Sequence, residues 1–353
     1  MPPFFSIAVP TFDRHDLLRE TLASLLAQDF ADFEVLVGND YTAEVLNGEL
    51  LGVNDPRIRF INHPRNLREV GNMNALLAAA RGRYFTWMFD DDLIEPGFLR
   101  VAHAILTERN GPPALYPRYR VLEDGGSYVP VEVTPGAVTR YSGREFLAHY
   151  FSGRLDVIST TAFFATELFR TTVCGVEELC DSAVGLYCEY LLLVRCALLG
   201  EILCVDAPYV VFRAHAESWG ASNTELHKYL QGGERLVRRS AAVLRHPDLR
   251  PELERSLLGL SRIHLAKLCF VAMRVEAAAP NFGPAAVGRA LAVVSEETAK
   301  IRKAVVAEGC GEWRARAGFA LLAAKSVYLL VFSWFYYGRR RRAQELPAAP
   351  IRQ

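Results

Sequence analysis

Short apolar runs alternate with amphipathic segments along the first part of the chain. Residues 4–9, 33–37 and 84–89 are apolar and rich in β-formers, and residues 57–61 alternate apolar with polar positions. Each of these runs predicts a strand, whereas the leucines after the first run and the pattern over residues 70–80 have the spacing of amphipathic helices. Strands separated by single helices are typical of parallel pairing with right-handed crossovers. The pattern therefore predicts an α/β fold with a mostly parallel sheet flanked by helices.

The rest of the chain changes character twice. Residues 110–160 are rich in turn formers and predict loops and short strands, while the apolar stretch 183–199 predicts a helix. From residue 224 onward the pattern is almost wholly helical. We therefore expect two parts, an α/β domain over residues 1–220 and a mainly helical region over residues 221–353.

Composition narrows the class of protein. The 353 residues are 51% hydrophobic and 23% charged, which provides a sizeable core and excludes wholesale disorder. Forty basic side chains balance forty acidic ones, so the overall charge is not that of a nucleic-acid-binding protein. We therefore expect no nucleic-acid partner.

The cysteines and the first residues indicate the cellular compartment. The seven cysteines include no C-x-x-C pair and have no histidine cluster near them, so the sequence predicts no zinc site. An odd number of cysteines in apolar surroundings is typical of buried thiols in a reducing compartment. The first apolar run meets Asp13 and Arg14 too soon for a signal sequence. These features predict a cytoplasmic protein.

Three consecutive carboxylates follow the strand predicted over residues 84–89. Successive side chains of an extended chain point to opposite sides, so we expect Asp90 and Asp92 to face one site, with Asp91 between them. Two carboxylates at the carboxyl edge of a sheet suit Mg²⁺ or Mn²⁺, with phosphate oxygens completing the coordination shell. The alternative is an acidic turn that caps a helix starting near Pro96.

Polar groups also follow the first two predicted strands. Pro10 is expected to end the first strand, which leaves Thr11 and the backbone of Asp13 to meet a base and a ribose. Asp40 can accept a hydrogen bond from the N–H edge of a nucleobase. Arg68 lies near the start of a helix whose N-terminus favours an anion. Ordinary turns, helix caps and a solvated helix start are the alternatives for these residues.

One carboxylate and one Arg-x-His element stand out later in the chain. Glu189 and Arg195 are the only charged residues of the stretch 183–199, and they lie on different faces of the predicted helix. A carboxylate without a local partner in an apolar helix has a raised proton affinity, as a general base requires. Pairing with a distant arginine or exposure to water is the alternative. Arg213 and His215 are expected on one side of the chain, where both can meet pyrophosphate oxygens or a metal ion.

Taken together, these motifs resemble family 2 of the inverting glycosyltransferases, which have the GT-A fold. The matching segments follow the family's order and spacing over about the first 220 residues; they are residues 5–14, 33–40, 66–74, 82–92 and 213–215. The resemblance implies a Rossmann-like GT-A domain that binds a nucleotide-sugar donor, most simply a UDP- or dTDP-sugar. It also implies Mn²⁺ or Mg²⁺ as cofactor.

The same resemblance implies roles for individual residues. Asp40 would read the base, Asp90 would lie near the ribose or the sugar, and Asp92 would hold the metal. Family members carry a Glu-Asp pair before the Arg-x-His element, and its second residue is the catalytic base. Cys188 and Glu189 occupy these positions here, so Glu189 is the predicted base. The alternative bases are Asp181, Glu177 and Glu178; the predicted donor-binding residues are Pro10, Thr11, Asp13, Arg14, Asp40, Arg68, Asn72, Asp90, Asp91 and Arg213; the predicted metal ligands are Asp92, Asp90 and His215.

The implied reaction is one in-line displacement at the anomeric carbon, with inversion of configuration. The base takes the proton of an acceptor hydroxyl, which would belong to a glycan or a lipid-linked glycan. Two other classes remain as rivals: a non-catalytic nucleotide-sugar or glycan-binding protein of the same fold, and a sugar nucleotidyltransferase.

The last part of the chain combines an apolar helix with a basic run. Residues 317–337 are long enough to span a bilayer, but Lys325 near the middle disfavours spanning. One hypothesis is an interfacial helix whose flanking arginines 339–342 are attracted to anionic lipid; the other is a helix buried against the rest of the protein. Residues 300–353 hold eleven basic and three acidic side chains, a net charge of +8. This balance supports a lipid-linked acceptor at the inner leaflet, while peripheral contact of residues 317–342 with the inner face of a membrane and burial of the helix both stay open.

Overall fold

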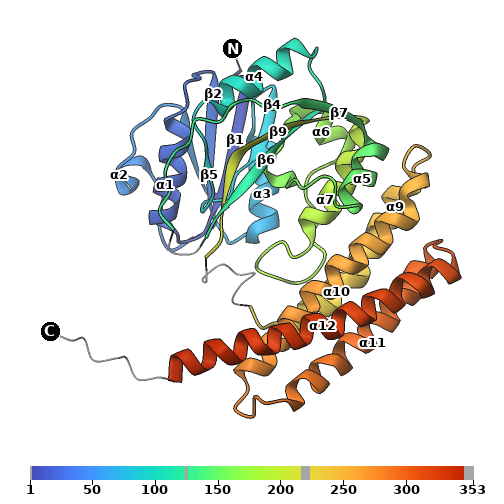
Figure 1. Cartoon of the computed structure of the whole chain (residues 1–353). Helices are drawn as coiled ribbons and strands as arrows, with labels where there is room; N and C mark the ends of the chain where they lie inside the picture. The colour runs from blue at the N-terminus through green and yellow to red at the C-terminus, as the bar shows by residue number, and fades with distance from the viewer. Residues whose placement is uncertain (1, 124–125, 216–222, 346–353) are drawn as a thin grey trace. The chain divides into compact units, whose positions relative to one another are not determined.

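The structure is a computed structural model that describes residues 2–123, 126–215 and 223–345. It divides into two compact units (Figure 1). The first unit consists of residues 1–221 and 243–252, and the second of residues 222–242 and 253–353. Each unit is described by itself below.

The first unit is built on a mixed sheet whose strand order is β3-β2-β1-β4-β8-β6-β9-β5, with β7 beside β9. Strands β1 to β4 pair in parallel, and helices connect them as the sequence pattern predicts. Because these strands are parallel, their carboxyl ends meet at one edge of the sheet. The strands are β1 Phe5–Thr11, β2 Phe33–Asn39, β3 Ile58–Asn62, β4 Tyr84–Trp87, β5 Leu93–Ile94, β6 Ala114–Leu122, β7 Val138–Ser142, β8 Phe163–Ala165 and β9 Glu201–Arg213.

Helices flank this sheet and make up most of the second unit (Figure 1). In the first unit they are α1 His15–Leu26, α2 Gly48–Leu51, α3 Arg68–Ala79, α4 Phe98–Glu108, α5 Gly143–Phe151, α6 Thr166–Thr172 and α7 Cys188–Cys196, with short 3-10 turns at Ser159–Thr161, Ala197–Leu199 and Arg250–Glu252. The remaining helices are α9 Leu226–Leu244, α10 Leu253–Ala278, α11 Ala285–Ala307 and α12 Glu312–Glu345.

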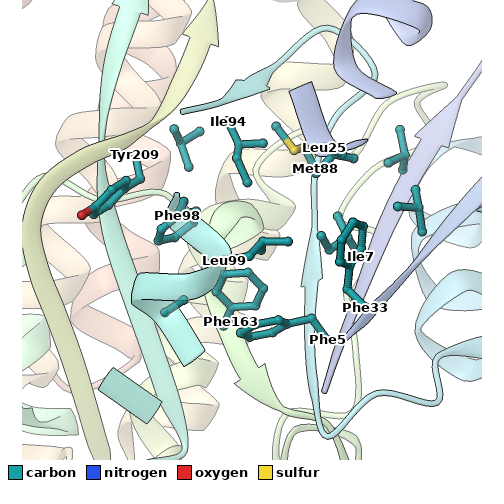
Figure 2. Close-up of a cluster of buried hydrophobic side chains, with 14 of the residues drawn as sticks. Phe5, Ile7, Leu25, Phe33, Met88, Ile94, Phe98, Leu99, Phe163 and Tyr209 are labelled. Carbon is teal, nitrogen blue, oxygen red and sulfur yellow. The ribbon is translucent and has the colours of Figure 1, made fainter. Parts of the chain in front are cut away.

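The main hydrophobic core lies between the sheet and the helices α1 and α4. Figure 2 shows Phe5 and Ile7 of β1 meeting Phe33 of β2 and Leu99 of α4 in this core. Phe98 stacks on Tyr209 of β9 with ring centroids 4.7 Å apart, which joins the far side of the sheet to the same core. Alternate positions of β1 and β2 thus anchor the parallel half of the sheet, and the polar edge beyond them is held in place.

Two predicted elements are shorter than the sequence pattern indicates. The strand expected over residues 84–89 ends at Trp87, and Asp90–Asp91 form a turn. The helix expected over residues 183–199 begins only at Cys188, because Tyr187 adopts a left-handed conformation with φ of 66°. A left-handed residue interrupts a right-handed helix, and apolar periodicity gives no sign of it.

Residues 110–160 contain more regular structure than expected. They form β6 and β7, and the helix α5 was not predicted at all. The start of α5 is a capping box, in which the Ser142 hydroxyl accepts the N–H of Glu145 and the Glu145 carboxylate accepts the N–H of Ser142. This Ser-x-x-Glu signal was present in the sequence and was overlooked.

In the second unit, α10, α11 and α12 pack against one another along their lengths (Figure 1). His264 of α10 and Glu297 of α11 form a buried pair, with Nε2 3.2 Å from Oε1. A side chain at Gly233 of α9 would collide with the His264 ring, so glycine is required for this close approach. Within the described residues, Arg250–Ala278 and Glu312–Arg339 are long and apolar enough to cross a membrane; the apolar windows are 67% and 28% buried, respectively.

Candidate active site

The candidate site lies at the carboxyl edge of the parallel strands. Thr11 ends β1, Asp40 follows β2 and the triplet that starts at Asp90 follows β4. The antiparallel register places Leu93 of β5 opposite Val211 of β9, so the end of β9 runs alongside the acidic triplet. Arg213 is thereby brought next to carboxylates more than a hundred residues away in sequence. Strand order alone assembles these groups.

The acidic triplet is a turn and not an extended chain. The N–H of Asp92 donates to the carbonyl oxygen of Phe89 at 3.2 Å, and the Thr21 hydroxyl of α1 lies within 3.0 Å of the carbonyl oxygens of Asp90 and Asp92. The expected alternation, with two carboxylates on one side, is therefore wrong as a geometric argument. All three carboxylates nevertheless belong to one cluster, because the turn gathers them.

Two carboxylates of the triplet are held by residues from other elements. The Thr11 hydroxyl donates to Asp90 Oδ2 at 2.7 Å, and the Arg14 guanidinium lies 2.9 Å from Asp91 Oδ2 and 3.4 Å from Asp90 Oδ1. His215 Nε2 lies 3.1 Å from the same Asp91 oxygen. Burial, followed by the like charge of Asp91, raises the pKa of Asp90 to about 6. The Arg14 guanidinium thus offsets part of an unfavourable concentration of negative charge.

Asp92 is the most buried member of the triplet and is incompletely satisfied. Its side chain is 1% exposed, and Oδ1 accepts the backbone N–H of Arg213 at 3.1 Å. Oδ2 has no hydrogen-bond partner among the described residues. Burial, together with the negative charges of Asp91 and Asp90, raises the pKa of Asp92 well above its ordinary value. A buried carboxylate oxygen of this kind requires a proton or a cation, so Asp92 fits a divalent metal.

Arg213 lies next to Asp92, and its positively charged side chain is also incompletely hydrogen-bonded. One guanidinium nitrogen donates to Glu20 of α1 at 2.7 Å, while Nε and the other terminal nitrogen are buried without a partner in the described part of the chain. Unpaired guanidinium N–H groups suit the oxygens of a diphosphate. Among the described residues, no three His, Cys, Asp or Glu side chains are already arranged to hold a metal. Metal binding at Asp92 would therefore use oxygens of the ligand as well.

Asp40 lies buried beyond β2, where it also stabilises the start of α3. Its Oδ1 accepts the backbone N–H of Leu67 at 2.6 Å, and burial is the main cause that raises its pKa. Asn72 donates to the carbonyl of Gly38 at 2.8 Å and lies 2.9 Å from His63 Nε2. In the described structure Asp40 and Asn72, both predicted to bind the donor, therefore connect α3 to β2 through hydrogen bonds.

The loop after β1 is only partly as predicted. Pro10 does not end β1, which continues to Thr11; β4 pairs with β1 only as far as Ala8, so the missing N–H of the proline breaks no hydrogen bond there. Asp13 is exposed and has a left-handed φ of 54°. Phe12, which sequence reasoning missed, is 49% exposed, and its ring meets Tyr41 edge-on at 5.3 Å between centroids. An exposed aromatic residue in a strand-end loop is the signal that could have identified it.

Arg68 contacts other carboxylates than those of the triplet. It pairs with Asp181 and, at 3.2 Å, with Glu178. Glu177 lies 3.6 Å from Arg195. Three of the predicted alternatives for the base are therefore engaged in ion pairs.

Glu189 lies in the first turn of α7 and is partly exposed. The expectation that it has no local partner is wrong, because the hydroxyl of Tyr190 hydrogen-bonds with it. The negative charge of Glu189 also contributes to raising the pKa of Tyr119 and of Glu69. Glu189 thus faces a set of ionisable groups and not bulk water alone.

Glu69 is a further acidic residue that sequence reasoning missed. Its carboxylate accepts the backbone N–H of Gly185, just ahead of α7. Burial, followed by the charges of Glu189, Asp90 and Asp91, raises the pKa of Glu69 to about 7. Glu69 is therefore close enough to interact electrostatically with both the predicted base and the acidic triplet. Its only sequence signal was its place in the segment 66–74, beside Arg68.

Comparison with known proteins identifies the domain that carries this site. The family model described as glycosyl transferase family 2 matches residues 6–171. Residues 6–171 therefore form a glycosyl transferase family 2 region. The predicted family and the predicted GT-A class of fold are confirmed.

Three similar proteins illustrate the relationship. A Campylobacter jejuni GalNAc(5)-diNAcBac-PP-undecaprenol beta-1,3-glucosyltransferase is 27% identical over 65% of this chain and 71% of its own length. The putative colanic acid biosynthesis glycosyl transferase WcaA of Escherichia coli is 33% identical over 28% of this chain, and the match spans only 36% of WcaA. The structure of S. aureus TarS residues 1–349 with UDP-GlcNAc matches with a TM-score of 0.61 and 19% identity, covering 96% of this chain and 92% of that one.

Proposed function

We propose that the protein is an inverting glycosyltransferase that moves a sugar from a UDP- or dTDP-sugar to a hydroxyl of a glycan or lipid-linked glycan. One observation carries the proposal: Asp92 and Arg213 meet at the carboxyl edge, and both side chains keep buried polar atoms that have no partner among the described residues. A metal-bound diphosphate supplies both missing partners, since the metal satisfies the carboxylate and the phosphate oxygens satisfy the guanidinium.

The loops after β1 and β2 supply groups that suit the nucleoside. Asp40 has a buried carboxylate, and a uracil or thymine base can donate an N–H to it. The exposed face of Phe12, supported edge-on by Tyr41, offers an aromatic surface of the kind on which a base stacks. This pair of features favours a pyrimidine nucleotide.

A divalent metal would be held by Asp92, with Asp90 and His215 as further ligands. Bound there, Mn²⁺ or Mg²⁺ would stabilise the negative charge of the departing diphosphate. The chain's own part is to orient that leaving group through the Arg213 N–H groups and to hold Asp91 and Asp90 in place through Arg14.

Glu189 is the proposed general base. Its carboxylate is anchored by the Tyr190 hydroxyl, and it lies in the first turn of α7. In the reaction Glu189 takes the proton of the acceptor hydroxyl as that oxygen attacks the anomeric carbon and the bond to the diphosphate breaks. The carboxylates of Glu177, Glu178 and Asp181 are already in ion pairs, which leaves Glu189 as the preferred candidate.

The relatives support a lipid-linked acceptor. The Campylobacter protein is described as acting on an undecaprenol-diphosphate-linked glycan, and its match covers most of both chains. That relative is a glucosyltransferase, which supports a hexose as the sugar transferred here.

A thermal-shift panel tests the donor part of the proposal. UDP, dTDP, GDP and CDP and their common sugar conjugates are each added with and without Mn²⁺, and a ligand present at about 100 times its Kd should stabilise the fold by about 2.7 kcal/mol. We expect a metal-dependent shift with UDP or dTDP. No shift with any nucleotide would refute the donor site.

The variant Glu189→Gln separates the enzyme from a non-catalytic binding protein of the same fold. The enzyme should lose about 10²- to 10⁴-fold in turnover while it keeps the donor-induced thermal shift. Unchanged turnover would remove Glu189 from the role of base. Absence of any turnover in the wild type, with donor binding intact, would favour the binding protein.

A further inference from the structure

The helix α12 presents an exposed apolar stripe that the proposed reaction does not use. We infer that this stripe docks the protein onto the surface of an anionic phospholipid bilayer. The stripe consists of Trp313, Leu321, Tyr328, Phe332, Phe335 and Tyr336, each between 50% and 70% exposed.

The spacing of these residues places them on one face of the helix. From Leu321 to Phe335 they recur at intervals of seven, four and three positions, and Tyr336 follows Phe332 by four, so they lie above one another along α12. Isolated exposed apolar residues are ordinary on soluble proteins, but a continuous row of this length marks an interaction surface. The stripe therefore requires an occupant.

The opposite face of α12 is covered within the second unit. Ala315, Phe319, Leu322 and Leu330 are buried, and α12 packs on α10 and α11. Near the end of the helix, Arg274 of α10 donates to the Tyr337 hydroxyl at 3.1 Å. One face of α12 is thus packed, and the other is exposed and carries Lys325, which is the pattern of a helix that lies along a membrane surface.

The excess of positive charge on α12 favours anionic lipid as the occupant of the stripe over a protein partner or a second copy of the chain. Between Glu312 and Glu345 the sequence contains no acidic residue, whereas it contains seven basic ones, including Lys325 within the exposed face. Two copies facing each other through this stripe would bring like charges together. A bilayer with anionic headgroups offers both an apolar layer and compensating charge, and aromatic side chains with polar tips favour that interface.

A groove beside the stripe also combines apolar and basic residues. It has a volume of about 620 Å³ and lies between α11 and α12, with Leu291, Val294 and Phe319 among its apolar lining residues. Arg302 and Arg316 also line it and share the single carboxylate of Glu312. One positive charge therefore remains beside an apolar groove, which suits an acyl chain with an anionic headgroup.

Flotation of the full-length protein with vesicles tests this inference. Vesicles of phosphatidylcholine alone are compared with vesicles that also contain phosphatidylglycerol, at low and high salt. We expect flotation with the anionic vesicles and weaker flotation at high salt, since surface charges are screened. No flotation with either vesicle at low salt would overturn the inference.

Paired variants locate the surface. Phe332→Ser with Phe335→Ser should weaken binding to anionic vesicles at least about tenfold, because two exposed aromatic side chains no longer insert. The control pair is Leu168→Ser with Val129→Ser, which removes two exposed apolar side chains of the first unit and should leave flotation unchanged. Equal loss in both pairs, or in neither, would overturn the assignment to α12.

Lys325→Gln separates lipid from a second copy of the chain. With lipid as the occupant, this variant should weaken binding to anionic vesicles and leave the sedimentation coefficient unchanged. If Lys325→Gln or the α12 aromatic pair instead changes the oligomeric state in analytical ultracentrifugation, with no effect on flotation, the stripe is a contact between copies and the inference is wrong.

Discussion

The buried carboxylates at the two ends of the same sheet differ in how completely they are hydrogen-bonded. At the amino end, Glu34 of β2 is 5% exposed and accepts hydrogen bonds from Ser6, Arg59 and Arg81 at 2.7 to 3.2 Å. At the carboxyl end, Asp92 is also buried, but one of its oxygens has no partner in the part of the chain that the structure describes. The first arrangement is complete without a ligand, and the second is not.

The pKa values follow the same division. Burial alone would raise the pKa of Glu34, but the hydrogen bonds from Ser6, Arg59 and Arg81 lower it overall. Burial and neighbouring negative charge raise the pKa of both Asp90 and Asp92. The comparison teaches that a buried charge alone does not mark a site. A site is marked by a buried charged group that lacks hydrogen-bond partners and lies beside a group of opposite charge that also lacks them.

Removal of the Asp92 carboxylate should have the largest effect. We expect Asp92→Asn to lower transferase activity by about 10³-fold or more, since the metal and the leaving group lose their main anchor. The fold should be as stable as the wild type at pH 7 or more so, because an uncompensated buried charge is gone. Initial rates and urea denaturation measure the two quantities, and a large loss of stability would contradict the comparison.

The matched change at the other end should reverse this outcome. Glu34→Gln removes the carboxylate that accepts hydrogen bonds from Ser6, Arg59 and Arg81, and we expect it to lower the free energy of unfolding by about 2 kcal/mol. Activity measured well below the melting temperature should remain near that of the wild type. A strong loss of activity in a folded Glu34→Gln sample would show that the two ends are not separable.

The dependence of stability on pH sharpens the contrast. A carboxyl whose folded pKa is raised adds stability while it is protonated, and this stability is lost as the pH rises from about 4 through the folded value, about 6 for Asp90. Asp90→Asn abolishes that loss, so its advantage over the wild type should grow by about 1 to 3 kcal/mol between pH 4 and pH 7.5.

Glu34 has a lowered pKa and therefore the opposite sign. Its stability is present above its ordinary pKa and is lost as the pH falls through the lowered value. Denaturation curves at pH 3.5, 5 and 7.5 for the wild type, Asp90→Asn and Glu34→Gln check both directions. Parallel behaviour of the two variants would refute the division between the ends.

The smallest effect is expected at Glu69. Because its pKa is raised to about 7, it changes charge in the neutral range beside the proposed base. Glu69→Gln should reduce kcat/KM only a few-fold, but it should flatten the dependence of kcat/KM on pH between about 6 and 8. A pH profile identical to that of the wild type would mean that Glu69 does not act on the reaction.

Much of the parallel half of the sheet was predictable, because each strand is a separate apolar run and helical spacing follows it. The part of the first unit after residue 110 was less predictable from the sequence. Strand β8 has only three residues, and the start of α7 depends on the left-handed Tyr187, neither of which leaves a periodic signal. Local backbone conformation outweighed the apolar pattern there.

For the site, sequence order and residue type were enough to nominate the triplet and the Arg-x-His element. The contacts were not predictable, since the pairing of Asp91 with His215 depends on β5 lying antiparallel to β9. Likewise, Arg68 points to Glu178 and Asp181, while Arg14 occupies the place beside Asp90. Glu69 was missed because only the fold brings it near Glu189.

Calorimetric titration of the selected nucleoside diphosphate, with and without Mn²⁺, tests the central claim most directly. The wild type and Glu34→Gln should bind the nucleotide in a metal-dependent manner, and Asp92→Asn should bind it at least about tenfold more weakly with the metal present. If Asp92→Asn binds the nucleotide and Mn²⁺ as tightly as the wild type, the unsatisfied carboxylate at the carboxyl edge is not the metal and diphosphate site.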